Sequence, residues 1–299
     1  MGGNATRRFL TFPTDTGRGS VAGCWYPDEQ EVSALVVVFD LDGVVYLGET
    51  PIPGAIDALN TLDRDGHILY FLTNNSTKNR DDYVDRLGRM GYRTERDRVM
   101  TSAFATGIHL KAIGATGKRV LVVGEKGLAE EMTLAGMQVV DYDDPEPVDF
   151  VVAGLDRGLT YAKLLRAHVE ITTRGATFIA TNEDATYPQE TGEIPGGGAI
   201  VAPIAYSTGV RPTAIGKPEP HAWRLILRLA GVAPGEAVMV GDRPETDICG
   251  ARALGLHTVL VLTGVTRAED VEALPESQRP DRVLSDLSGL PTLVARLLG

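Results

Sequence analysis

Cysteine is scarce in this chain of 299 residues, and long apolar runs are absent. The two cysteines, Cys24 and Cys249, are far apart and form neither a metal-binding pattern nor a disulfide framework, which fits a reducing cytosol. No stretch approaches the roughly 18 consecutive apolar residues of a membrane-spanning helix, and the N-terminus lacks the apolar core of a signal peptide. These absences disfavour a disulfide-rich secreted domain and a membrane protein, so we expect a cytoplasmic protein without a membrane partner.

Basic residues are also fewer than acidic ones: the chain has 29 lysines and arginines and 40 aspartates and glutamates, which gives a formal net charge of −11. Such a chain would repel nucleic-acid phosphates at long range, so we expect no nucleic-acid partner, although a local cationic pocket could still hold one small phosphate. The five histidines lack the spacing of metal ligands, which disfavours a zinc site. Hydrophobic residues make up 43% of the chain, enough for a sizeable core.

Short apolar runs alternate with helical patterns along most of the chain, which is typical of βαβ units around a parallel sheet. The predicted strands cover residues 35–39, 68–72, 119–124, 138–141, 150–153, 177–180, 213–215, 237–240 and 258–262. The predicted helices cover residues 55–65, 80–90, 128–135, 161–173, 199–206, 222–230, 248–254 and 290–298. Residues 182–198 show no apolar periodicity, so we expect a long loop there, and such loops are usually functional or mobile.

Polar residues follow four of these short apolar runs, where parallel strands would deliver them to one edge of a sheet. They are Asp40 and Asp42, then Thr73 with Asn74, Asn75 and Ser76, then Lys217, and finally Asp242 with Asp247. Two carboxylates as close as Asp40 and Asp42 repel each other unless a cation lies beside them or one keeps a proton, and a divalent metal is the simplest remedy. Jointly the four groups indicate a site for metal-assisted phosphoryl transfer.

Each group alone also has an ordinary explanation. Aspartate and glycine are common turn residues, so Asp40 and Asp42 could simply begin a turn. The segment 73–76 could form an Asx turn with a helix cap, Asp247 could cap the following helix, and Lys217 could be a solvated loop residue. The combination, in this order, is what favours a catalytic site.

The same four segments resemble the motifs of the haloacid dehalogenase (HAD) superfamily. The detailed sequences of these segments and of several others are similar to a branch of the superfamily that contains NagD-type phosphatases, 4-nitrophenylphosphatases and the phosphoglycolate and pyridoxal phosphate phosphatases. The segments that carry this likeness are 40–46, 53–55, 72–76, 123–127, 181–184, 216–218 and 241–247. The resemblance covers about residues 34–285. It implies an α/β fold with a Rossmann-like parallel-sheet core over residues 31–104 and 211–299 and an inserted smaller α/β cap domain over 105–210. Residues 1–30 lie outside the resemblance and are rich in Gly, Thr, Pro and Asp, so we expect an N-terminal extension there.

The resemblance also implies a role for each motif residue in an Mg²⁺-dependent phosphatase. Asp40 would be the nucleophile that forms an aspartyl phosphate, and Asp42 would protonate the leaving alcohol and then deprotonate the attacking water. Thr73 and Lys217 would hold the transferring phosphoryl oxygens. The implied Mg²⁺ ligands are the Asp40 carboxylate, the Asp42 backbone carbonyl and Asp242, with Asp247 orienting a water or Lys217.

Substrate contacts are implied for the cap domain, from the segment 182–198. Tyr187 stands where the pyridoxal phosphate phosphatase has a histidine and the phosphoglycolate enzyme a leucine, which puts either substrate in doubt. Tyr187 could also be a surface aromatic packed on the loop. Asn74, Asn75 and Asn182 are the other expected substrate contacts.

The expected activity is hydrolysis of small-molecule phosphate monoesters. Three alternatives stay open at this point: phosphotransfer to an acceptor other than water, as in mutases of the superfamily, non-catalytic binding of a phosphorylated metabolite, and a nicotinamide-dependent reaction. Relatives often dimerise through the cap, so a homodimer of that kind is a further open expectation. The physiological substrate is not predicted.

Overall fold

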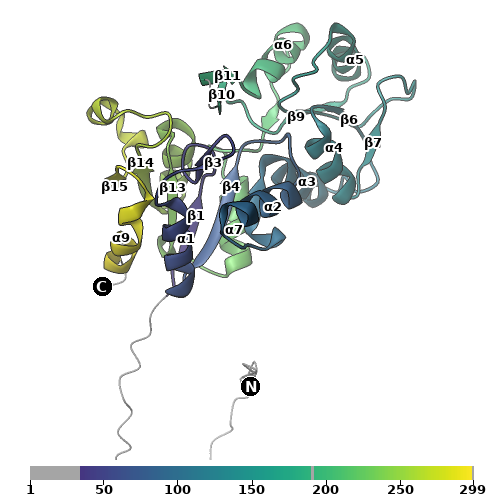
Figure 1. Cartoon of the computed structure of the whole chain (residues 1–299). Helices are drawn as coiled ribbons and strands as arrows, with labels where there is room; N and C mark the ends of the chain where they lie inside the picture. Colours follow the sequence, from purple (N-terminus) through teal and green to yellow (C-terminus); the bar gives the residue numbers. More distant parts are fainter. Residues whose placement is uncertain (1–33, 190–191, 298–299) are drawn as a thin grey trace, which may run out of the picture. The chain divides into compact units, whose positions relative to one another are not determined.

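The computed structural model describes residues 34–189 and 192–297, and the predicted extension over residues 1–30, with Cys24, lies outside them. The first of its two large sheets has six parallel strands in the order β15-β14-β13-β1-β4-β5 (Figure 1). These strands are β1 (Val36–Phe39), β4 (Ile68–Thr73), β5 (Val99–Thr101), β13 (Ala237–Gly241), β14 (His257–Val261) and β15 (Arg282–Leu284).

Helices cover both faces of this sheet because successive residues of a buried strand point to opposite sides. Val37 and Phe39 of β1 share a buried cluster with residues of α1 (Ala55–Arg64), α2 (Arg80–Met90) and α9 (Leu290–Leu297). Val36 and Val38 belong to a second cluster, whose helices include α3 (Ser102–Ala112), α7 (His221–Ala230) and α8 (Cys249–Leu254), and which continues to α4 of the second sheet (Lys126–Leu134). The strand therefore needs apolar side chains on both faces, which explains its continuous apolar run.

The second large sheet has five parallel strands in the order β12-β9-β8-β6-β7. Its strands are β6 (Arg119–Val123), β7 (Gln138–Val140), β8 (Phe150–Ala153), β9 (Thr177–Ala180) and β12 (Thr213–Ala214). One face packs with α5 (Tyr161–Thr172) and α6 (Gly198–Thr208), and the other with α4 (Lys126–Leu134). Along the chain this sheet is inserted between β5 and β13, and β12 lies inside the range predicted for the core.

The prediction of a loop over residues 182–198 is wrong in part, because this segment contains an antiparallel hairpin of β10 (Thr186–Gln189) and β11 (Gly192–Pro195). A proline in each of these short strands and their largely polar composition removed the apolar alternation that predicts a strand. Helix α3 was also missed. It packs against both α4 and α7, so it has apolar residues on more than one side and no amphipathic period.

Shorter elements complete the described part of the chain. They are β2 (Tyr46–Leu47), β3 (Thr50–Pro51), a π-helical turn at Pro244–Ile248, and 3₁₀ turns at Arg96–Arg98, Pro234–Glu236, Ala268–Ala273, Glu276–Gln278 and Leu287–Gly289. Among the described residues, no helix is both long and apolar enough to cross a lipid bilayer.

The strand order brings the motif residues together. Strands β13, β1 and β4 are neighbours in the middle of the first sheet and all run in the same direction, so their carboxyl ends share one edge. Asp40 follows β1, Thr73 ends β4 and Asp242 follows β13. Lys217 comes from the segment between β12 and α7. A crevice at the carboxyl ends of strands is where α/β proteins bind their ligands.

Candidate active site

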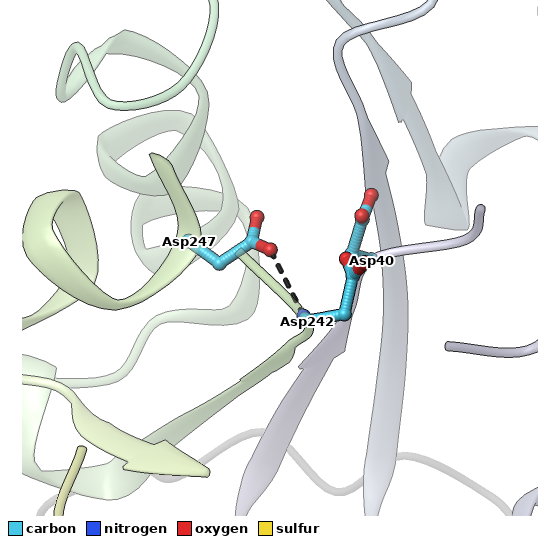
Figure 2. Close-up of side chains that lie close together, drawn as sticks. All are labelled: Asp40, Asp242 and Asp247. Carbon is cyan, nitrogen blue, oxygen red and sulfur yellow. Dashed lines mark hydrogen bonds between the residues drawn. The ribbon is translucent and has the colours of Figure 1, made fainter. Parts of the chain in front are cut away.

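The ammonium group of Lys217 lies within a cluster of buried carboxylates. Its Nζ is 2.8 Å from Oδ1 of Asp40 and 2.6 Å from Oδ1 of Asp247. Carboxylate oxygens of Asp40, Asp242 and Asp247 lie within 4.8 Å of one another (Figure 2). All four side chains are buried. With all three carboxylates ionised, the cluster carries three negative charges against one ammonium, an excess of two.

Asp247 uses both of its carboxylate oxygens within the protein. Oδ1 is paired with Lys217, while Oδ2 accepts the backbone N–H groups of Asp242 at 3.2 Å and Arg243 at 3.1 Å. The π-helical turn that carries Asp247 folds back onto β13, and a Cβ on Gly241 would clash with the Asp247 side chain. Asp247 therefore holds the loop of Asp242 and the side chain of Lys217 in place.

Asp242 has one carboxylate oxygen with a partner and one without. Oδ2 accepts the backbone N–H of Val265 at 2.8 Å, whereas Oδ1 is buried and has no hydrogen-bond partner among the residues that the structure describes. Gly43 packs against this carboxylate with a φ of +85°, and a Cβ there would lie 2.7 Å from Oδ2. A buried carboxylate oxygen left without a donor, beside two further carboxylates, is the donor set that a hard divalent cation prefers.

Burial and mutual repulsion make the carboxylates harder to ionise. Burial raises the pKa of Asp242 well above its usual value, and the charges of Asp40 and Asp247 raise it further. Burial also raises the pKa of Asp40, against the opposing effect of Lys217. Burial alone would lower the pKa of Lys217, but Asp247 and Asp40 outweigh it and the pKa is raised. Lys217 is therefore charged, and the cluster favours the arrival of a further cation.

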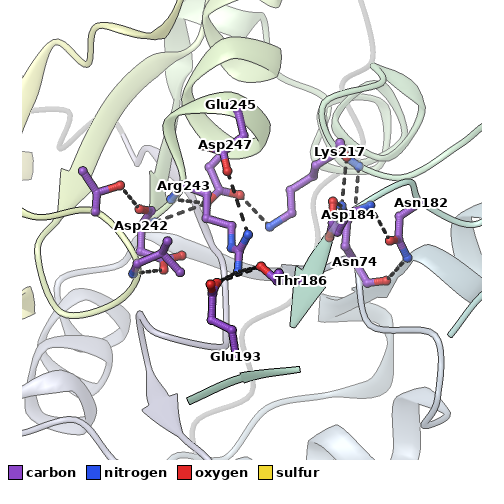
Figure 3. Close-up of polar contacts among 12 residues, drawn as sticks. Asn74, Asn182, Asp184, Thr186, Glu193, Lys217, Asp242, Arg243, Glu245 and Asp247 are labelled. Atoms are coloured by element: carbon purple, nitrogen blue, oxygen red, sulfur yellow. Dashed lines mark hydrogen bonds and ion pairs between the residues drawn. The ribbon is translucent and has the colours of Figure 1, made fainter. Parts of the chain in front are cut away.

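Asn74 joins the cap hairpin region to the backbone of Lys217. Its Oδ1 accepts the Lys217 N–H at 2.8 Å, and its Nδ2 donates to the Lys217 carbonyl at 2.9 Å and to both oxygens of Asp184 at 3.0 Å (Figure 3). Asn182 donates from Nδ2 to the Asn74 carbonyl at 2.8 Å. Both asparagines were expected to contact substrate, yet these contacts of their amides are with protein groups that hold Lys217.

Tyr187 reaches the carboxylate of Asp42 from strand β10. Its hydroxyl donates to Oδ1 of Asp42 at 3.0 Å and accepts a hydrogen bond from Nδ2 of Asn75 at 3.0 Å. Tyr187 is therefore part of the site and not merely a surface aromatic of the loop. Burial raises the pKa of Asp42, and the hydrogen bond from Tyr187 opposes that effect. Thr73 accepts the Asn75 backbone N–H at 3.1 Å and can donate its own hydroxyl proton to another oxygen.

Most of the site residues predicted from the sequence line a single cavity. The catalytic and substrate-contact candidates that line it are Asp40, Asp42, Thr73, Asn74, Asn75, Asn182, Tyr187 and Lys217. The remaining candidates, Asp242 and Asp247, are fully buried beside Asp40 and Lys217. All the residues predicted from the sequence are thus brought to one place, at the carboxyl ends of β1, β4 and β13.

Sequence reasoning missed several residues that line the cavity or close it. Nη2 of Arg243 lies 3.2 Å from Oε1 of Glu193 and 3.5 Å from Oγ1 of Thr186, and the Thr186 hydroxyl donates to Glu193 at 2.7 Å (Figure 3). Arg243 follows Asp242 directly, so the neighbourhood of that motif was the one signal available. Thr186 and Glu193 lie on the hairpin, whose strands were not predicted.

Family models and known proteins both match this chain. A family described as haloacid dehalogenase-like hydrolase matches residues 37–138, and a second, HAD-hydrolase-like family matches residues 214–290. The acid sugar phosphatase of Staphylococcus saprophyticus is 38% identical over 251 residues, which cover 84% of this chain and 94% of that protein. The chain belongs to the haloacid dehalogenase-like hydrolases. The superfamily predicted from the four motifs is confirmed.

Solved structures of other haloacid dehalogenase-like hydrolases share the architecture. The p-nitrophenyl phosphatase from Archaeoglobus fulgidus is 32% identical, with a TM-score of 0.80 over 87% of this chain and 99% of that one. The glycerol phosphate phosphatase from Mycobacterium tuberculosis, in complex with magnesium, is 34% identical, with a TM-score of 0.77 over 89% and 76% of the two chains. These likenesses confirm the nitrophenylphosphatase branch and the parallel-sheet core with a second parallel sheet as its cap.

Proposed function

We propose that this protein is a divalent-metal-dependent phosphatase that hydrolyses small phosphate monoesters through a phosphorylated Asp40. The observation that carries the proposal is the placement of Asp40, which lines the cavity, is paired with Lys217 at 2.8 Å and clusters with the carboxylate of Asp242. A carboxylate held by a fixed ammonium in a buried site is suited to attack phosphorus, because the ammonium also attracts the oxygens of the incoming phosphoryl group.

The class of substrate is supported by the relatives. Their names include an acid sugar phosphatase, a p-nitrophenyl phosphatase and a glycerol phosphate phosphatase, whose alcohols differ in shape and polarity. What these substrates share is a phosphate monoester on a small organic group. The protein is a phosphatase of this class, and no single physiological substrate follows from the comparisons.

The reaction we propose has two steps on this chain's own residues. A carboxylate oxygen of Asp40 forms a bond to phosphorus while the ester P–O bond breaks, and Asp42 gives its proton to the departing oxygen. Water then attacks the phosphorus of the acyl phosphate while the bond from phosphorus to the Asp40 oxygen breaks. Asp42 takes a proton from that water, inorganic phosphate leaves, and the Asp40 carboxylate is restored. Thr73 and Lys217 hold the phosphoryl oxygens in both steps, in agreement with their places in the cavity.

The metal we propose is Mg²⁺, held by the Asp40 carboxylate, the Asp42 backbone carbonyl and Oδ1 of Asp242. A divalent cation there would offset the charge of the phosphoryl group and of the nucleophile. It would also supply the two positive charges that the buried cluster lacks. Asp247, with both oxygens already engaged, would position Lys217 and the Asp242 loop. A cytoplasmic location and a homodimer through the cap stay predictions.

The direct test replaces the nucleophile. Asp40→Asn should lower kcat on 4-nitrophenyl phosphate by about three orders of magnitude or more, because an amide cannot form the acyl phosphate. Acid quenching with labelled substrate should trap phosphate on the wild-type protein and not on the variant. Asp85→Asn, at an exposed position of α2, is the matched control and should keep full activity. Wild-type turnover by Asp40→Asn would overturn the proposal.

A further inference from the structure

The hydroxyl of Tyr187 contacts the group that we assign as general acid, and this contact has a consequence for catalysis. Tyr187 lies on β10 of the cap hairpin, whereas Asp42 follows β1 of the core, 145 positions away in the sequence. We propose that Tyr187 is a positioning residue: its hydroxyl holds Oδ1 of Asp42 and so turns Oδ2 toward the leaving oxygen of the substrate. This inference rests on the proposed function of Asp42.

The hydrogen-bond inventory of Tyr187 favours this role over recognition of the substrate. A tyrosine hydroxyl has one proton to donate, and in Tyr187 that proton goes to Asp42 at 3.0 Å. The same oxygen accepts a hydrogen bond from Nδ2 of Asn75 at 3.0 Å. Because the hydroxyl of Tyr187 already donates one hydrogen bond and accepts another, the part of the side chain that is left to contact a substrate is the aromatic ring.

The partners of Tyr187 are themselves fixed. Oδ1 of Asn75 accepts the backbone N–H of Thr77 at 2.9 Å and the hydroxyl of Thr77 at 2.8 Å, which aims Nδ2 of Asn75 at Tyr187. The hairpin is held on its other side by Glu193, which contacts Arg243 of the core at 3.2 Å. A defined path of hydrogen bonds therefore connects the end of β4, through Asn75 and Tyr187, to the carboxylate of Asp42.

The effect of this positioning can be measured in the first chemical step. When the ester P–O bond breaks, a basic alkoxide or phenoxide needs a proton from Asp42, whereas 4-nitrophenoxide leaves with little help. A carboxyl group that has lost its orientation should therefore slow esters of basic alcohols most. The dependence of kcat/KM on the basicity of the leaving group reports this effect, because kcat/KM covers the steps up to leaving-group departure.

The experiment uses substituted phenyl phosphates, which vary leaving-group basicity at nearly constant shape. We expect Tyr187→Phe to lower kcat/KM for phenyl phosphate by about tenfold, equivalent to about 1.4 kcal/mol, and for 4-nitrophenyl phosphate by about twofold at most. Tyr187→Leu, which lacks both hydroxyl and ring, should steepen the dependence to a similar degree and guards against a folding defect of one variant. Tyr161→Phe, in an exposed position on α5, should match the wild type.

Asp42→Ala separates the role of the general acid from the role of Tyr187. Asp42→Ala alone should steepen the dependence of kcat/KM on leaving-group basicity. Adding Tyr187→Phe should steepen that dependence no further, because the tyrosine acts through a carboxylate that is no longer present. If Asp42→Ala leaves the dependence unchanged, the proposed function of Asp42 fails. If Asp42→Ala steepens it while Tyr187→Phe lowers all esters equally, or none, only the positioning role fails. Additive effects in the double variant would also overturn that role.

Discussion

Asp242→Asn should stabilise the metal-free protein while it removes activity. In the wild type, Oδ1 of Asp242 is buried without a partner in the described part of the chain, and two neighbouring carboxylates repel it. Asparagine keeps a carbonyl oxygen for the N–H of Val265, which donates at 2.8 Å to the present carboxylate. Its amide places an N–H donor where the unpartnered oxygen was, in a cluster that contains the carboxylates of Asp40 and Asp247. The substitution thus removes one negative charge and satisfies one buried polar atom.

The expected gain in the free energy of unfolding equals the free-energy cost of burying the unpartnered oxygen of Asp242. A buried polar atom left without a partner costs about 1–3 kcal/mol, so we expect the free energy of unfolding to rise by about 2 kcal/mol. For a protein of this size that corresponds to an increase in Tm of about 4–8 °C. Activity should be lost in the same variant, since the amide carries no charge to hold a divalent cation.

The sign of the pH dependence provides a second check. The folded-state pKa of Asp242 is raised above its unfolded value, so its contribution to stability is fully present below the unfolded pKa and is lost as pH rises through the folded pKa. The wild type loses this contribution progressively as pH rises above the unfolded pKa of Asp242, and Asp242→Asn has no carboxyl group there to lose it. The difference in Tm between the two proteins should therefore be larger at about pH 7.5 than at about pH 5.

Calorimetry in the presence of a chelator measures these differences, with Asp85→Asn as a control for loss of an exposed carboxylate. Adding Mg²⁺ at about 100 times its Kd should stabilise the wild type by about 2.7 kcal/mol and leave Asp242→Asn almost unchanged. With Mg²⁺ present, the wild type should therefore be as stable as the variant or more stable. A variant that melts at or below the wild-type temperature in chelator at neutral pH would refute the reasoning.

Three further substitutions test other contacts. Lys217→Met leaves the carboxylates without their ammonium, so metal-free stability should fall by about 3–5 kcal/mol in urea titrations and turnover of aryl phosphates should be nearly lost. Glu131→Ala leaves the buried guanidinium of Arg80 without its 3.1 Å partner, so stability should fall by about 3–5 kcal/mol, while kcat per folded molecule, from active-site titration, stays at the wild-type value. Gly43→Ala places a Cβ 2.7 Å from the Asp242 carboxylate at a φ of +85°, and isothermal titration should show weakened Mg²⁺ binding.

The central strands and the motif residues could be predicted because their signals are local. Strand β1 is buried on both faces, so its four residues are all apolar and easily recognised. Asp40 and Asp242 come directly after such strands, and parallel strands place the residues at their carboxyl ends along one edge of the sheet. Lys217 was less evident, because β12 before it has only two residues. The family motif, and not the strand pattern, identified it.

The contacts between cap and core could not be predicted, because they join residues far apart in the chain. Asp184 and Asn74 are 110 positions apart, and nothing in either local sequence indicates the other. The hydrogen bond from Tyr187 to Asp42 depends on a hairpin whose prolines and polar residues give no strand signal. A residue's place in a motif predicts its position at the site, whereas its hydrogen-bond partner is set by the tertiary structure.

The cap is attached to the core on one side by buried contacts around α4. Glu131 of α4 is 1% exposed and pairs with Arg80 at the start of α2, and Glu130 accepts a hydrogen bond from Asn79 at 2.7 Å. The backbone of Gly127 donates to Thr77 at 3.2 Å, in a contact too close for any side chain at Gly127. Opening on this side would separate the ion pair and also expose Leu128 and Met132 of α4, which share a buried cluster with residues of the core, so this attachment resists opening.

The hairpin β10–β11 is attached to the core by weaker contacts. Glu193, which pairs with Arg243, has a side chain that is 48% exposed, and an exposed pair contributes about 1 kcal/mol or less. A neutral hydrogen bond adds about 0.5–1.5 kcal/mol, and the charged acceptor Asp42 brings the Tyr187 contact to about 1.5–3 kcal/mol. A movement that opens the cavity therefore costs least if the hairpin lifts while α4 stays in place. Lifting the hairpin removes Tyr187 from Asp42, so the general acid would be fully oriented only when the cavity is closed over its substrate.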